Sequence, residues 1–153
     1  MKLSEKIKKL EFLDRFSLFE VPNFLEEVIY KDLNATYPDA SLFSAHNDFA
    51  KSLMDDNDNF ANFLEKNDKW KIFIEKLNTK LFAEDLIKLF NLKNVYFSKN
   101  NWKKNIPNFK KVKLSFCFNI SEEGGYSLPH TDSTRKLVSM VLFFVDNAWS
   151  EKN

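Results

Sequence analysis

The sequence predicts an α+β protein, with helices in the first part of the chain and strands after them. Up to residue 92, apolar residues recur every three or four positions, which is the period of an amphipathic helix. From residue 93 onward the period changes to two, and β-branched and aromatic residues accumulate as they do in strands. We therefore expect one domain over residues 1–153, with a helical portion at 1–92 and a mainly β core at 93–153.

The composition is that of a globular chain large enough to bury a core. It has 153 residues, of which 44% are hydrophobic and 16% aromatic. The 23 Lys and Arg residues nearly balance the 22 Asp and Glu residues, and both signs are interspersed. No basic face large enough to dominate phosphate binding is evident, so nucleic acid is not indicated as a partner.

Several features of the sequence favour a cytoplasmic location. Cys117 is the single cysteine and cannot form a disulfide within the chain, which fits a reducing compartment. The N-terminal residues contain lysines but no continuous apolar stretch of the kind found in signal peptides. No run approaches the roughly 18 apolar residues that a membrane span requires, so we expect no membrane association.

The first predicted helix lies within residues 21–33, where Pro22 suits the first helical turn. Its apolar face would consist of Phe24, Leu25, Val28, Ile29 and Leu33. Residues 56–92 carry the same period. Their Asn and Asp residues at the start of the segment and around Asn67, together with Asn78 and Thr79, are typical helix caps. This segment predicts two or three short helices whose Trp and Phe side chains lie in the core.

Three segments of the second part are predicted strands. A short strand is expected within residues 94–102. Within residues 110–120, apolar and polar side chains alternate from Val112 onward, which predicts a half-buried strand with Cys117 on the polar parity. We expect Cys117 to be a small buried filler and not a nucleophile. Residues 136–145 form a β-branched and aromatic run, which predicts a strand buried on both faces.

The polar residues between the last two predicted strands have the pattern of a metal site. His130 and Asp132 are two positions apart, so an extended backbone places both side chains on one face. An imidazole and a carboxylate are two of the three ligands of the facial triad in non-haem Fe(II) oxygenases. Gly124 and Gly125, the only glycines, would turn the chain before the motif, and Pro129 would fix an extended backbone there. An H-x-D tripeptide also occurs by chance.

His46 is the only other histidine. It lies in the helical portion of the sequence, near residues typical of a helix cap. We expect it to be a surface or capping residue and not a metal ligand.

Taken together, residues 118–149 resemble the 2-oxoglutarate- and Fe(II)-dependent dioxygenase superfamily, in particular its prolyl 4-hydroxylase-like branch. The matching positions, in order, are Gly124, Gly125, Pro129, His130, Asp132, Lys136, Ser139 and Trp149. More loosely, residues 19–38 are similar to the family's opening strand and helix, and residues 63–86 to the helix pair that follows.

The resemblance implies a double-stranded β-helix, which is a distorted jelly roll of the cupin-like type, with helices packed along one side. The reaction would be oxidative decarboxylation of 2-oxoglutarate to succinate, coupled to hydroxylation of a C–H bond of an unidentified prime substrate by O₂. His130 and Asp132 would hold the Fe(II). Tyr126 and Leu128 would line the cofactor site, with Ser139 and Val141 on the facing wall, and ascorbate is a further candidate cofactor.

In that family a distal histidine and a basic residue that binds 2-oxoglutarate follow the Trp. The resemblance therefore implies that residues 1–153 are the front portion of such an enzyme, with an incomplete triad and an incomplete β core. Without the later strands, residues 136–145 would expose an edge and an apolar face. We expect a chain in this state to aggregate or to bind another chain.

Two alternative functions remain at this point. The first is a non-catalytic jelly-roll module for binding or assembly, or an inactive fragment, in which the fold is kept without the chemistry. The second is a purely structural helical protein in which the H-x-D is a coincidence, and it predicts almost no strand content.

Overall fold

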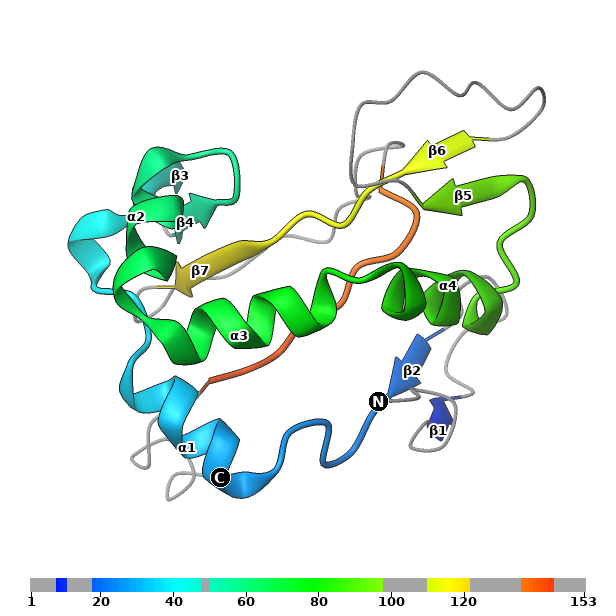
Figure 1. The fold of residues 1–153 in the computed structure, drawn as a ribbon, viewed down its shortest axis with the longest axis horizontal. Helices are drawn as coiled ribbons and strands as arrows, with labels where there is room; N and C mark the ends of the chain where they lie inside the picture. Colours follow the sequence, from blue (N-terminus) through cyan, green and yellow to red (C-terminus); the bar gives the residue numbers. More distant parts are fainter. Residues whose placement is uncertain (1–7, 11–17, 48–49, 98–109, 122–135, 145–153) are drawn as a thin grey trace. The chain divides into compact units, whose positions relative to one another are not determined.

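The structure is a computed structural model, and it describes residues 8–10, 18–47, 50–97, 110–121 and 136–144 (Figure 1). The described helices are α1 (Glu27–Ala35), the short 3-10 helix η2 (Ala40–Leu42), α2 (Asp58–Lys66), α3 (Asp68–Leu77) and α4 (Lys80–Leu89). The described strands are β1 (Lys8–Leu10), β2 (Leu18–Glu20), β3 (Ser44–Asn47), β4 (Ala50–Met54), β5 (Val95–Phe97), β6 (Lys110–Val112) and β7 (Cys117–Ser121).

The chain divides into two compact units. Unit 1 comprises residues 1–29 and 75–114, and unit 2 comprises residues 30–74 and 115–153. Each unit therefore combines residues from the expected helical portion with residues from the expected β portion.

Unit 1 contains two small sheets and the helix α4. β1 and β2 pair antiparallel, whereas β5 and β6 pair parallel, with Val95 opposite Lys110. The N-cap of α4 is Thr79, whose hydroxyl accepts a hydrogen bond of 3.2 Å from the backbone N–H of Phe82. α4 packs against β5, and the side chain of Phe82 is buried.

Unit 2 is built on an antiparallel sheet with the strand order β3-β4-β7. β4 pairs with β7 from Ala50 opposite Ser121 to Met54 opposite Cys117. The helix α2, capped by the side chain of Asn57, packs against β4. The β4–β7 pairing joins residues 50–54 to residues 117–121, which lie more than sixty positions further along the sequence.

The core of unit 2 is a cluster of aromatic rings centred on Trp70, whose side chain is 2% exposed. Trp70 also donates a hydrogen bond of 2.9 Å from its indole Nε1 to the carbonyl of Thr36. Rings in contact with Trp70 are those of Tyr37, Phe63, Phe73, Phe118 and Phe144. Among the described side chains of this unit, Leu33 and Leu53 are also fully buried.

The helical period and the caps are confirmed between residues 56 and 92. Asn57 and Thr79 are N-caps, and Asn67 is the C-cap of α2. The expected burial of the helical aromatics is confirmed for Trp70 and Phe60. The predicted start of the first helix is wrong, because Asn23 has a φ of 52° and the chain turns there before α1 begins at Glu27.

The strand predictions are confirmed in part. β5 lies within residues 94–102, and residues 112–120 alternate between partly or fully buried apolar side chains and exposed polar ones. The single strand expected over residues 110–120 is wrong, because this segment contains two strands, β6 and β7, which belong to different sheets. The first ninety residues also contain β1 to β4, so an exclusively helical front is wrong.

The prediction of a strand buried on both faces at residues 136–145 is wrong for the described part, residues 136–144. These residues are not in a strand, and their largest side chains include exposed ones, with Val141 68% and Phe143 78% exposed. An apolar run favours burial, but strand formation also requires a partner for the backbone N–H and C=O groups.

The described residues thus show a mixed helix and sheet protein, which is compatible with the α+β class. Because they include seven strands, the purely helical alternative is wrong. They form three small sheets, and the double-stranded β-helix stays a prediction.

Candidate functional site

The predicted iron ligands His130 and Asp132 lie outside the described residues, as do Tyr126 and Leu128. Two described segments of unit 2 flank them in the sequence. β7 ends at Ser121, before the ligands, and residues 136–144 follow them. The structure therefore defines how the two segments on either side of the motif are held.

Both flanking segments contact the same two aromatic side chains, Tyr37 and Trp70. Phe118 of β7 places its ring centroid 4.8 Å from that of Trp70 and 5.4 Å from that of Tyr37. Phe144 lies at 5.3 Å from Trp70 and 5.8 Å from Tyr37, measured in the same way. Aromatic pairs at these distances contribute beyond the area that they bury. The residues before and after the predicted metal ligands are thus anchored on one core.

The entry to β7 is fixed by the carboxylate of Asp55. Its Oδ1 accepts a hydrogen bond of 2.9 Å from the hydroxyl of Ser115, and its Oδ2 accepts one of 2.9 Å from the backbone N–H of Phe116. The N–H of Asp55 in turn donates to the carbonyl of Phe116 at 3.0 Å. Asp55 lies in an acidic stretch of the sequence, but both of its carboxylate oxygens already have protein partners.

Tyr37 holds the middle of β7 through its hydroxyl, which donates a hydrogen bond of 3.0 Å to the carbonyl of Asn119. Desolvation by burial raises the pKa of Tyr37. Tyr37 is therefore a protonated hydrogen-bond donor at neutral pH.

Cys117 is exposed, so the expectation of a buried filler is wrong. Its position in β7 turns the side chain to the polar side of the strand, where its Sγ donates to Oδ1 of Asn119 at 3.4 Å. Partial desolvation raises the pKa of the Cys117 thiol. A raised pKa keeps the thiol protonated at neutral pH, which is the opposite of what activates a cysteine nucleophile.

The two described residues of the predicted cofactor wall are Ser139 and Val141. Both are exposed, in the segment 136–144. Their part in a cofactor site stays a prediction, because Tyr126 and Leu128, the residues expected to face them, lie outside the described part of the chain.

His46 lies in β3, three residues after Phe43, the C-cap of η2, and is not itself a cap. It lies at a register shift, because Ala45 pairs with Lys51 while Asn47 pairs with Ala50. Ala50 also pairs with Ser121, the last residue of β7. The backbone of His46 is therefore at the end of the sheet from which the chain continues toward His130.

Among the residues that the structure describes, no group of three or more His, Cys, Asp and Glu side chains is placed to hold a metal ion. The His130 and Asp132 pair itself supplies one imidazole and one carboxylate, a donor set that suits Fe(II). The donor types of His130 and Asp132 thus fit Fe(II), but both residues lie outside the described part of the chain.

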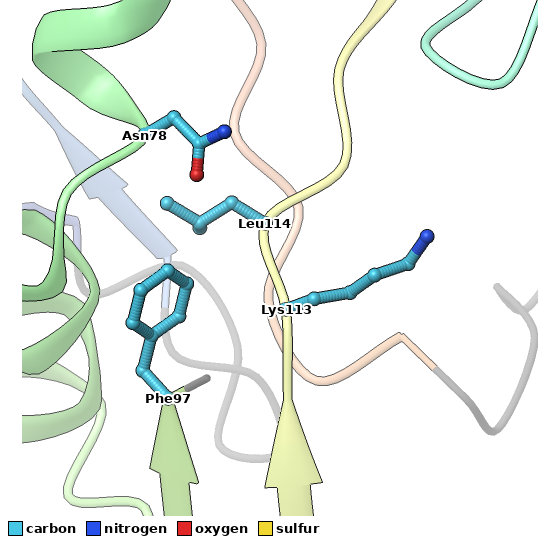
Figure 2. Close-up of a pocket in the computed structure, with 4 residues that line it drawn as sticks. All are labelled: Asn78, Phe97, Lys113 and Leu114. Carbon is cyan, nitrogen blue, oxygen red and sulfur yellow. The ribbon is translucent and has the colours of Figure 1, made fainter. Parts of the chain in front are cut away.

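A small hollow in unit 1 is lined by Asn78, Phe97, Lys113 and Leu114 (Figure 2). Figure 2 shows Asn78, Phe97 and Leu114 pointing toward one another, while the amino group of Lys113 extends away from them. Its volume is about 100 Å³, whereas sites for small molecules occupy roughly 300–1,000 Å³. The hollow is too small for a substrate site.

Comparison with family models gives no match, and comparisons with curated proteins and with solved structures give no significant similarity. Within the described residues, no helix is both long enough and apolar enough to cross a bilayer. The dioxygenase likeness therefore depends on the residues of the sequence alone.

Proposed function

We propose that this chain is part of an Fe(II)- and 2-oxoglutarate-dependent dioxygenase, a hydroxylase similar to the prolyl 4-hydroxylases, which acts on a protein side chain or a small molecule. The observation that carries the proposal is the order of residues from Gly124 to Trp149, with His130 and Asp132 at its centre. Two features of the fold support it. A half-buried strand, β7, precedes the motif, and both flanking segments are anchored on Tyr37 and Trp70.

His130 and Asp132 would act as metal ligands. His130 would bind through one neutral ring nitrogen and Asp132 through its carboxylate, so metal binding should weaken as the pH falls and protons compete for both ligands. When bound, the iron together with 2-oxoglutarate and O₂ would supply the oxidising chemistry. The anchored segments on either side, β7 and residues 136–144, would hold the two ligands at a fixed separation, which is what a preorganised site requires.

The proposal is tested by metal binding in three single-alanine variants. Mn²⁺ serves as a redox-stable probe, and its free concentration is followed by electron paramagnetic resonance during a titration. We expect His130→Ala and Asp132→Ala each to weaken binding by about ten-fold or more, since each removes a ligand. His46→Ala is the matched control, because it removes the other histidine of the chain, and it should leave binding unchanged.

Turnover provides the second readout. In a protein that also supplies the distal histidine and the basic residue, with Fe(II), 2-oxoglutarate and O₂ present, succinate formation should be abolished by His130→Ala and by Asp132→Ala. Succinate formation that persists unchanged in either variant would contradict the proposal. Equal Mn²⁺ binding in all three variants would favour a non-catalytic binding module.

A further inference from the structure

β7 is a terminal strand of its sheet. Within the described residues, the strand order β3-β4-β7 leaves one side of β7 without a neighbouring strand. A terminal strand presents backbone N–H and C=O groups on which a strand of another molecule can pair. Natural proteins avoid such pairing by placing specific side chains at the edges of their sheets.

The register identifies the groups of β7 that point outward. The N–H of Asp55 donates to the carbonyl of Phe116, so Phe116 faces β4 with its backbone groups. Opposed residues of an antiparallel pair alternate between hydrogen-bonded and non-hydrogen-bonded. Phe118 is therefore a hydrogen-bonded position opposite Leu53, and Asn119, opposite Ser52, directs its N–H and C=O away from β4.

The outward carbonyl of Asn119 accepts the hydroxyl of Tyr37, at 3.0 Å. Asn119 is the central residue of the five-residue strand β7. The ring of Tyr37 is held by edge-on contacts with Trp70 and Phe118 and by stacking on Phe43. The hydroxyl is therefore presented by a fixed ring, which positions it on the middle of the edge.

We propose that Tyr37 prevents the outer edge of β7 from pairing with β7 of a second copy of this chain. Two copies of β7 related by a two-fold axis at Asn119 would run antiparallel, and each central carbonyl would have to accept the N–H of the other copy. The Tyr37 hydroxyl occupies that carbonyl. Pairing therefore requires the loss of the Tyr37 bond in both copies. This inference is independent of the proposed enzymatic function.

The direct test is Tyr37→Phe, which removes the hydroxyl and keeps the ring. Self-association is measured by sedimentation velocity over a range of protein concentrations. We expect the variant to dimerise at concentrations about ten-fold or more below those of the wild type. In the variant, dimerisation no longer breaks a hydrogen bond between Tyr37 and Asn119 in each copy. The matched control is Thr36→Val, which removes the neighbouring hydroxyl and its 2.8 Å bond to the carbonyl of Asp32, and it should associate as the wild type does.

A second substitution tests whether the association uses this edge. The N–H of Asn119 points outward, so Asn119→Pro removes it without removing a bond to β4, and proline is tolerated on edge strands. The double variant Tyr37→Phe with Asn119→Pro should return to the association of the wild type. Dimerisation that is equal in Tyr37→Phe and Thr36→Val, or that survives Asn119→Pro, would overturn the proposal.

The contact itself is tested on the wild-type chain, which keeps the proposal falsifiable if Tyr37→Phe does not fold. In a proton NMR spectrum, the hydroxyl proton of Tyr37 should exchange slowly and show cross-relaxation to the backbone protons of Asn119 and Ile120. If this hydroxyl proton exchanges freely with water in a folded chain, the proposed role of Tyr37 at the edge of β7 is overturned.

Discussion

Replacement of Trp70 by alanine should nearly unfold unit 2. Its side chain is 2% exposed and touches five other aromatic rings, and burying such a side chain is worth about 3–5 kcal/mol by truncation. The variant also leaves the carbonyl of Thr36 without its 2.9 Å bond from the indole, which costs about 1 kcal/mol more. We expect Trp70→Ala to lower the free energy of unfolding by about 4–6 kcal/mol, a large part of the roughly 5–15 kcal/mol typical of a domain.

Urea denaturation followed by far-ultraviolet circular dichroism measures this loss. With a slope of about 2 kcal/mol per molar urea, the midpoint should fall by about 2–3 M. Trp70→Phe keeps a ring and loses the indole bond, so it should cost about 1–3 kcal/mol. Ile72→Ala is the control on the same helix, because Ile72 is 51% exposed, and it should cost at most about 1 kcal/mol. A loss below about 2 kcal/mol for Trp70→Ala would refute the assignment of Trp70 as the centre of the core.

Two further predictions follow from the contacts of β7. Asp55→Ala should lower the free energy of unfolding by about 1–3 kcal/mol, because the N–H of Phe116 and the hydroxyl of Ser115 lose their acceptor; an unchanged urea midpoint would contradict this. The pKa values of Cys117 and Tyr37 are raised above their ordinary values of 9.0 and 10.0. The unfolded chain therefore loses these protons first, and stability that is fully present below pH 9 should decline as the pH rises further. A pH series of urea midpoints should show this decline, and Cys117→Ser combined with Tyr37→Phe should reduce it; a decline that is equally steep in the double variant would argue against these two groups.

Local patterns predict the helices of this chain well. The three- and four-residue spacing between residues 56 and 92 is confirmed, because the apolar positions of these helices include the buried side chains of Phe60, Trp70 and Phe82. The caps Asn57 and Thr79 are equally local, since a cap side chain bonds to a backbone N–H two or three residues away. The alternation along residues 112–120 is also local, and the burial of Phe118 follows it.

The strands of the first ninety residues could not be predicted in the same way. They are three to five residues long, which is too short for a period of two to be distinguished from chance. β4 is stabilised by β7, a partner more than sixty residues further along the chain, and no local pattern encodes that pairing.

The roles of Tyr37 and Asp55 were missed for the same reason. Tyr37 lies in a turn before Pro38, and its partner Asn119 is 82 residues away. Asp55 begins an acidic stretch that looks like an exposed helix start, and its partners Ser115 and Phe116 lie about sixty residues away. At residues 136–144, by contrast, the local pattern predicts a strand that the structure does not contain. The hydrophobicity of this run predicted a buried strand, but only some of its side chains are sheltered, among them Phe144, which packs on Trp70.

The central claim is that His130 and Asp132 bind a metal ion. The chain has only two histidines, so nuclear magnetic resonance of the imidazole groups reports on each of them separately. On addition of Mn²⁺, the account predicts selective broadening of the His130 signals, with those of His46 much less affected, and loss of this selectivity in Asp132→Ala. Equal broadening of both histidines, or selective broadening that persists in Asp132→Ala, would contradict it.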